Sequence, residues 1–177
     1  MSLLNQTLTL TSNGNKTPVK VPVKTPYIIT VMVNNNDMIA GTHAGMLLIG
    51  PDIFEIFDPN GSFEYPGIAS GSMRLFPVYE ANQRADVYKK YLEYQLADGG
   101  EVYVYKFHVS KQDFKQIQDR IEYGEGCSGV LNCSKCVSNA VTGISAFKSL
   151  PPDIFLPSSL KKELDKLKAP LKILKNK

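Results

Sequence analysis

The sequence has few residues that could bind a metal ion or form disulfides. Its 177 residues include three cysteines and two histidines. These numbers exclude a disulfide framework and a pair of zinc sites, and they leave at most one metal site or one thiol-centred active site. Catalytic chemistry is therefore to be sought first at these five side chains.

The sequence also lacks long apolar runs. No segment approaches the roughly 18–20 consecutive apolar residues that a membrane-spanning helix needs, so we expect no transmembrane segment. The first 24 residues are polar and contain Pro18 and Pro22, whereas a Sec-type signal needs an apolar core of about 7–15 residues. We therefore expect no Sec-type signal, which leaves a cytoplasmic protein or secretion by another route.

Positive charge is concentrated at one end of the chain. The formal net charge is +3, but residues 161–177 hold seven lysines against Glu163 and Asp165, which leaves −2 for all other residues. A slightly acidic body is not typical of a nucleic-acid binder. Leu160, Leu164, Leu167 and Leu171 recur at helical spacing, which predicts a solvated, lysine-rich helical segment with a break at Pro170. Attraction to an anionic cell envelope is the alternative role for this segment.

Composition predicts one globular domain with an extension at each end. The chain is 43% hydrophobic and 21% charged, which is ordinary for a soluble domain of this length. Residues 1–25 are rich in Thr, Asn, Pro and Lys and are expected to form a flexible arm. We place the folded domain at 26–150 and the lysine-rich helical extension at 151–177.

Apolar periodicity predicts both strands and helices. Strands are expected at 27–33, 42–49, 53–57 and 101–109, with 42–49 and 53–57 forming an antiparallel hairpin around Gly50, Pro51 and Asp52. Helices are expected at 84–97, from Ser110 to Gly124, and from Asn132 onward. Residues 59–83 show no period and are expected to be a functional loop that could wall a cleft. This order of elements is typical of an α+β fold with an antiparallel sheet.

Cys133 is the best placed of the three cysteines for catalysis. Asn132 is a good helix N-cap, which puts Cys133 in the first helical turn. There the unpaired backbone N–H groups and the helix dipole stabilise a thiolate, and the same N–H groups can bind an oxyanion. Cys127 and Cys136 lack that position and are expected to be structural.

His43 and Asp58 are the candidate base and its orienting carboxylate. His43 lies at the start of its expected strand, where sites are often built. If the hairpin turns at Gly50 and Pro51, residues whose numbers sum to 101 face each other, so Asp58 faces His43. A slip in register would bring Glu55 or Asp52 into competition. Asp58 is also typical of a turn residue in its Asp-Pro-Asn-Gly setting.

A zinc site is the competing interpretation of the cysteines. Cys127, Cys133 and Cys136 with His43 or His108 would supply four ligands of the right type. However, structural zinc sites use two closely spaced pairs on turns, and this sequence has one pair at the head of a helix. His108 is most simply a strand residue on the face of Lys106, without a catalytic role. We expect no metal and no cofactor.

Three motifs together resemble a known family. They are a histidine opening a hairpin strand at 42–46 (THAGM), an acidic residue on the next strand, and the later Asn132-Cys133 helix start. This arrangement resembles the circularly permuted papain-like group of the NlpC-type cell-wall peptidase superfamily. Residues 57–62 (FDPNGS) are similar to the corresponding segment of papain-like effectors delivered by bacterial type VI secretion. The resemblance covers roughly residues 27–147.

The resemblance implies a papain-like cysteine hydrolase with Cys133 as nucleophile, His43 as general base and Asp58 as its orienter. The expected substrate is an amide bond in a peptidoglycan stem peptide, and the expected setting is an antibacterial effector that acts in a target-cell periplasm. An immunity protein or a secretion apparatus would be its partner. Two alternatives stay open: a lipid-directed acyltransferase or hydrolase of the same group, and a non-enzymatic binding protein on this scaffold.

Overall fold

A computed structural model of the chain describes residues 4–12, 15–23, 26–35, 43–66, 74–124, 127 and 131–175. Its centre is a six-stranded sheet in the order β6-β5-β4-β3-β7-β8, in which every neighbouring pair is antiparallel. The strands are β3 (Tyr27–Asn35), β4 (Ala44–Ile49), β5 (Phe54–Phe57), β6 (Phe76–Pro77), β7 (Glu101–Val109) and β8 (Leu171–Lys175). Together with its helices, this sheet makes the chain an α+β protein, as the sequence predicts.

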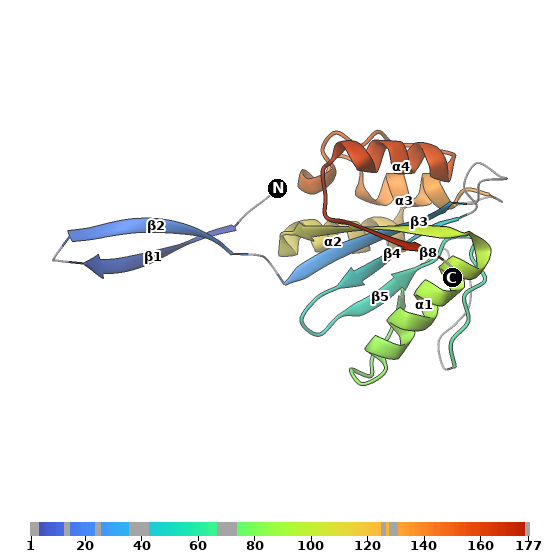
Figure 1. Cartoon of the computed structure of the whole chain (residues 1–177), viewed down its shortest axis with the longest axis horizontal. Helices are drawn as coiled ribbons and strands as arrows, with labels where there is room; N and C mark the ends of the chain where they lie inside the picture. Colours follow the sequence, from blue (N-terminus) through green and yellow to red (C-terminus); the bar gives the residue numbers. More distant parts are fainter. Residues whose placement is uncertain are drawn as a thin grey trace.

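Helices cover both faces of the sheet (Figure 1). Helix α1 (Arg84–Asp98) packs on one face, and α2 (Lys111–Tyr123), α3 (Cys133–Val141) and α4 (Pro157–Lys166) pack on the other. Strand β3 serves both sides, because Val31 and Val33 join the core under α2, α3 and α4 whereas Met32 joins the core under α1. A strand buried on both faces is mostly apolar, which explains why its sequence is apolar from Tyr27 to Val33 apart from the buried Thr30.

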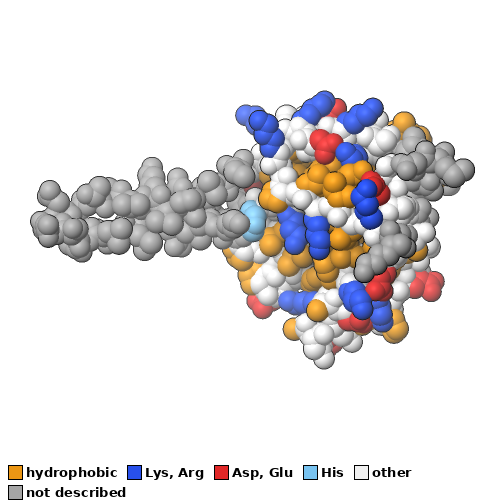
Figure 2. All heavy atoms as spheres, viewed as in Figure 1, with side chains coloured by type: hydrophobic (Ala, Val, Ile, Leu, Met, Phe, Trp, Pro, Cys, Tyr) orange, Lys and Arg blue, Asp and Glu red, His pale blue; other side chains and the backbone are white. Residues whose placement is uncertain are grey.

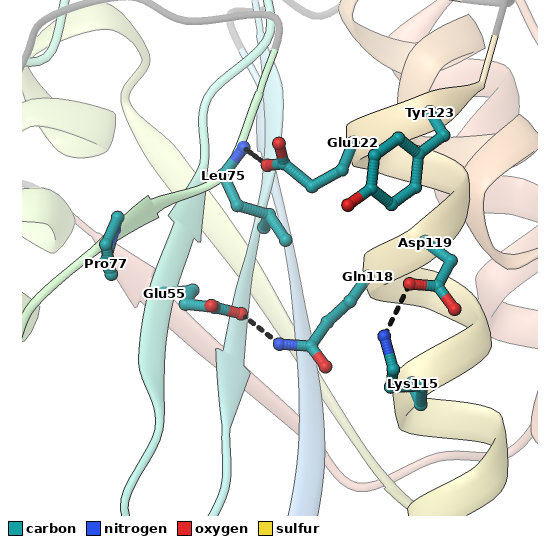
Figure 3. Close-up of a pocket in the computed structure, with 8 residues that line it drawn as sticks. All are labelled: Glu55, Leu75, Pro77, Lys115, Gln118, Asp119, Glu122 and Tyr123. Atoms are coloured by element: carbon teal, nitrogen blue, oxygen red, sulfur yellow. Dashed lines mark hydrogen bonds and ion pairs between the residues drawn. The ribbon is translucent and has the colours of Figure 1, made fainter.

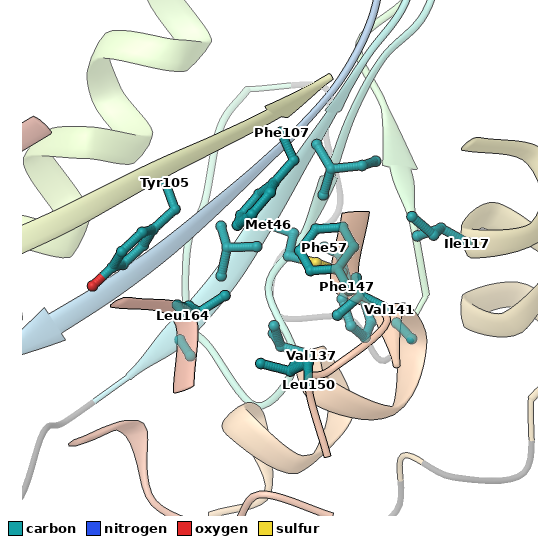
Figure 4. Close-up of a cluster of buried hydrophobic side chains, with 14 of the residues drawn as sticks. Met46, Phe57, Tyr105, Phe107, Ile117, Val137, Val141, Phe147, Leu150 and Leu164 are labelled. Carbon is teal, nitrogen blue, oxygen red and sulfur yellow. The ribbon is translucent and has the colours of Figure 1, made fainter. Parts of the chain in front are cut away.

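The larger core lies between the sheet and the α3 side of the molecule. Figure 4 shows its centre, where Met46 and Phe57 from the sheet meet Val137 and Val141 of α3. Phe107 of β7 packs against Phe147 with ring centroids 4.3 Å apart. This core places α3 against β4, the strand that follows His43.

Most of the predicted elements are confirmed. Helices α1 and α2 and strand β7 have the expected positions, and α2 begins as predicted, with the Ser110 Oγ accepting a hydrogen bond from the Asp113 N–H at 3.0 Å. The hairpin of β4 and β5 is antiparallel, as expected. Of the expected functional loop at 59–83, the part at 67–73 lies outside the described residues, as does Thr42.

The two ends of the chain differ from the expectation. Within 1–25, strands β1 (Leu4–Ser12) and β2 (Asn15–Val23) pair with each other as a separate antiparallel sheet that the sequence did not predict. The flexibility of this arm stays a prediction.

The lysine-rich extension is part of the domain rather than a solvated helix. Leu160 and Leu164 of α4 are fully buried in the larger core. The helix ends at Lys166, and the chain beyond Pro170 forms β8, which pairs with β7, so the expectation that Leu171 continues a helix is wrong. The chain leaves the helix before Pro170, at Lys168, whose φ of 51° is the left-handed conformation that commonly follows a helix C-cap.

Acidic side chains neutralise part of the lysine-rich segment. Lys161 pairs with Asp165 and Lys166 with Glu163, each within α4, and Lys175 of β8 pairs with Glu101 of β7. On the face seen in Figure 2, basic and acidic side chains are interspersed around exposed apolar side chains. Within the described part of the chain, no helix has both the length and the apolar character needed to cross a membrane.

Candidate functional site

His43 and Asp58 form a buried contact at one end of the β4–β5 hairpin. The His43 Nε2 lies 2.6 Å from the Asp58 Oδ1. His43 is 5% exposed and Asp58 is fully buried. Asp58 also accepts hydrogen bonds from the Tyr91 hydroxyl at 2.8 Å and from the Phe63 N–H at 3.3 Å. A carboxylate that accepts three hydrogen bonds is held in one orientation, and it fixes the orientation of the imidazole.

The predicted contact is present, although the predicted register is wrong. The hairpin pairs Met46 with Phe57 and Ile49 with Phe54, so facing residues sum to 103 rather than 101. One step beyond the last pair, Asp58 comes opposite Gly45 and diagonal to His43. A shift of two residues keeps each side chain on its own face of the sheet, which is why His43 and Asp58 still meet.

Cys133 completes the group from a separate element. It is the first residue of α3, is 5% exposed, and lies close enough to the His43 ring and to the Ala44 backbone N–H for both to lower the pKa of its thiol. Because Asp58 holds Nε2 of His43, Nδ1 is the ring nitrogen left for the sulfur. The three residues chosen from the sequence therefore lie together in the order sulfur, imidazole, carboxylate.

Mutual electrostatic stabilisation shifts the pKa values of both His43 and Cys133. Burial lowers the pKa of His43, but hydrogen bonds and negative charge from Asp58 and Cys133 outweigh burial and raise it to about 9. Burial raises the pKa of Cys133, but the His43 ring and the Ala44 amide outweigh it, so the pKa lies below its ordinary value. Each partner thus favours the charged form of the other.

The start of α3 differs in one detail from the expectation. Asn132 occupies the N-cap position, but its side chain makes no capping hydrogen bond, and its carbonyl oxygen accepts from the Cys136 N–H at 2.8 Å. The first-turn N–H groups after Asn132 have no acceptor within the helix. They are available to the thiolate and to an oxyanion that forms beside it.

The other two cysteines form a disulfide that the sequence reasoning missed. Cys127 bonds to Cys136, with the Cα atoms 5.0 Å apart, and Cys133 is the free thiol. The bond links the loop before α3 to the helix one turn below the nucleophile. It also removes two ligands from the four-ligand zinc set considered above, so that interpretation does not fit.

The competing carboxylates lie elsewhere. Glu55 accepts a hydrogen bond from the Gln118 Nε2 at 2.7 Å and lines a cavity of about 320 Å³ between the sheet and α2 (Figure 3). Asp52 is exposed in the hairpin loop. His108 lies in β7 opposite Ile28, away from the Cys133 group. Neither Glu55 nor Asp52 replaces Asp58 beside His43.

Tyr91 is a member of the site that the sequence did not reveal as functional. It lies four residues after Val87, a helical spacing that is typical of a core residue, and it is fully buried. Only the structure shows that its hydroxyl reaches Asp58.

Comparison of the chain with protein-family models, with curated proteins and with solved structures returns no match.

Proposed function

We propose that the protein is a cysteine hydrolase that cleaves amide bonds. The observation that supports this most strongly is the contact of Cys133, His43 and Asp58, three residues from separate elements, with a raised histidine pKa and a lowered thiol pKa. An isolated buried cysteine would instead have its pKa raised by burial. The arrangement suits a nucleophile, a proton carrier and an orienter.

In the proposed reaction the Cys133 thiolate attacks the carbonyl carbon of the substrate and forms a carbon–sulfur bond. N–H groups of the first turn of α3 stabilise the oxyanion. The His43 imidazolium gives its proton to the leaving nitrogen, and the carbon–nitrogen bond breaks. Neutral His43 then takes a proton from water as the water oxygen attacks the thioester carbonyl carbon. The carbon–sulfur bond breaks, which releases the acid and restores the Cys133 thiolate beside the His43 imidazolium. Asp58 keeps the ring oriented throughout.

We propose peptidoglycan stem peptides as the substrate and a permuted papain-like fold as the scaffold. Both rest on the resemblance of the THAGM, FDPNGS and Asn132-Cys133 motifs, and the observed antiparallel sheet with the thiol-bearing helix is compatible with it. The Cys127–Cys136 disulfide supports action in an oxidising compartment, such as the periplasm of a target cell. An immunity protein and a secretion apparatus are the partners that this setting implies.

The test compares purified cell-wall sacculi treated with the parent protein and with Cys133→Ala. We expect the parent to release soluble peptide fragments, and Cys133→Ala to release none, because the nucleophile is absent. Chromatography with mass spectrometry identifies the fragments. Lys135→Ala is the matched control: Lys135 lies two residues further along α3 and pairs with Asp153, outside the catalytic group. We expect it to retain activity.

Three results would contradict the proposal in different ways. If the Cys133→Ala variant still hydrolysed sacculi, Cys133 would not be the nucleophile. Intact sacculi together with turnover of phospholipid vesicles by the parent, lost in Cys133→Ala, would assign the site to the lipid-directed alternative. Slow alkylation of Cys133 at neutral pH would favour the non-enzymatic scaffold, since an activated thiolate reacts quickly.

A further inference from the structure

A closed circuit of hydrogen bonds leads from Asp58 back to the backbone of His43. The Tyr91 hydroxyl donates to the Asp58 Oδ1 at 2.8 Å, and the Gln95 Nε2 donates to the Tyr91 hydroxyl at 2.9 Å. The Asn34 Nδ2 donates to the Gln95 Oε1 at 3.2 Å, and the Asn34 Oδ1 accepts from the His43 N–H at 2.7 Å. Asn34, Asp58, Tyr91 and Gln95 are all fully buried.

The charge on Asp58 determines the direction of every bond in this circuit. An ionised carboxylate only accepts, so the single Tyr91 hydroxyl proton points at Asp58. Gln95 must then present its NH₂ group to Tyr91, which turns its oxygen toward Asn34. Asn34 in turn presents its NH₂ group to Gln95, and its oxygen is left to accept from the His43 N–H. The Asn34 Nδ2 also donates to the Gln95 backbone carbonyl at 3.3 Å, and the His43 N–H, which can only donate, requires the same orientation of Asn34 from the other end of the circuit.

We propose that Tyr91 is a positioning residue for the catalytic pair, and that Gln95 and Asn34 fix the direction of its proton. This inference rests on the proposed roles of Cys133, His43 and Asp58. Tyr91 holds the Asp58 oxygen that binds the His43 Nε2, and Asn34 holds the His43 backbone. The ring is therefore fixed both through its nitrogen and through its main chain.

Packing around Tyr91 supports this role. Its ring lies 5.0 Å from that of Phe63 and 5.9 Å from that of Tyr94, centroid to centroid, so the hydroxyl has little freedom to leave Asp58. Burial first, and then the charge of Asp58, hold the Tyr91 pKa well above its ordinary value. Tyr91 therefore stays a neutral donor wherever the enzyme would work.

The test measures how fast Cys133 is alkylated by iodoacetamide between pH 5 and 10. Because the other two cysteines form the disulfide, Cys133 is the single free thiol, and no substrate is needed. In Tyr91→Phe, Asp58 loses the donor that orients it, so the imidazolium and its partner thiolate lose stabilisation. We expect the apparent thiol pKa to rise, and alkylation at pH 7 to slow about three- to tenfold.

Gln95→Glu tests the direction of the hydrogen bonds in the circuit. It also provides a second test of the proposal if Tyr91→Phe does not fold. A protonated carboxyl can donate to Tyr91 as the amide does, whereas an ionised one only accepts and competes with Asp58 for the Tyr91 proton. We expect alkylation rates to match the parent at low pH and to fall below it as the new carboxyl ionises. A merely structural role for Gln95 would produce no such pH-dependent change.

Tyr105→Phe is the matched control. Tyr105 is also buried and also donates to an aspartate, Asp165 at 2.6 Å, but it packs against α4 away from His43. We expect its alkylation profile to follow the parent. A Tyr91→Phe profile that coincides with that of Tyr105→Phe, or a lowered thiol pKa, would overturn the proposal. Because alkylation needs no substrate, this failure is distinguishable from failure of the proposed hydrolysis.

Discussion

The two sides of the candidate site are held in place by different forces. On the strand side, buried hydrogen bonds fix His43 and Asp58 in both position and direction. On the helix side, Cys133 belongs to the larger apolar core, and the Cys127–Cys136 disulfide fastens its helix to the preceding loop. Hydrogen bonds define the strand side, whereas packing and one covalent bond define the helix side.

This difference follows from what each side must do. An imidazole transfers protons only along its two N–H directions, so its tautomer and its orientation must both be fixed. A thiolate carries its charge on one large atom and needs mainly to be in the right place. We therefore expect loss of a hydrogen-bonding group on the strand side to alter reactivity more than stability, and loss of the disulfide on the helix side to do the reverse.

The largest effect is expected from Asp58→Asn. The amide NH₂ of an asparagine at this position would face the His43 Nε2, so the ring would carry its proton on Nδ1, toward Cys133, and could not act as the base. Hydrolysis should fall about 10³–10⁴-fold, measured as the rate of fragment release from sacculi. The control is Asp165→Asn, which removes another tyrosine-bonded carboxylate, and we expect it to stay near the parent rate. A loss under tenfold for Asp58→Asn would show that Asp58 does not orient the base.

A smaller effect, on stability instead of reactivity, is expected when the disulfide is removed. The bond closes a short loop with a sequence separation of 9, so Cys127→Ser combined with Cys136→Ala should lower the free energy of unfolding by about 2–3 kcal/mol. Urea unfolding measures this change. A reducing agent should destabilise the parent and leave the double variant unaffected. If the double variant shifts the Cys133 thiol pKa more than Tyr91→Phe does, the proposed division between the two sides is wrong.

The sequence was informative where periodicity determines structure. The buried strand β3 and the helices α1 and α2 follow from their apolar spacing. Cys133 was found from its helix start and His43 from its strand end. The role of Tyr91 could not be predicted, because a tyrosine at a core position of a helix has the same sequence pattern whether or not its hydroxyl contacts a functional group. The disulfide was missed because spacing alone does not determine which of three cysteines pair.

The register of the hairpin shows a different limit. A turn centred between Gly50 and Pro51 would need these two residues as its central pair, but the observed loop spans residues 50–53, with the Gly50 N–H bonded to the Ile53 carbonyl at 2.8 Å. The observed register makes Pro51 the first of the two central turn residues, where its fixed φ is favourable, whereas the predicted register would make it the second, where proline is disfavoured in the common type I turn. Turn geometry of this kind is not encoded in apolar alternation. The corrected register puts Gly45, instead of His43, opposite Asp58.

Gly45→Ala should produce the smallest of the three effects and is the sharpest probe of the strand side. A Cβ at Gly45 would overlap the Tyr91 hydroxyl and come within 3.1 Å of the Phe57 carbonyl oxygen. Because Phe63 and Tyr94 hold the Tyr91 ring, the hydroxyl would be pushed off Asp58. We expect the free energy of unfolding to fall by about 1–3 kcal/mol, and the thiol pKa to rise as in Tyr91→Phe. Gly100→Ala, where an added Cβ meets nothing within 4 Å, is the control.

Combining Gly45→Ala with Tyr91→Phe distinguishes two causes of the Gly45→Ala effect. One is overlap of the new Cβ with the Tyr91 hydroxyl, and the other is a general disturbance of β4. Phenylalanine lacks the oxygen that the new Cβ would strike, and the nearest remaining atom of the ring, Cζ, would lie 3.2 Å away. The double variant should therefore be more stable than the sum of the two single losses predicts. It should keep the raised thiol pKa, because the donor to Asp58 is still absent. Simple additivity in urea unfolding would mean that Gly45 is needed by the strand itself, and not by the contact of Tyr91 with Asp58.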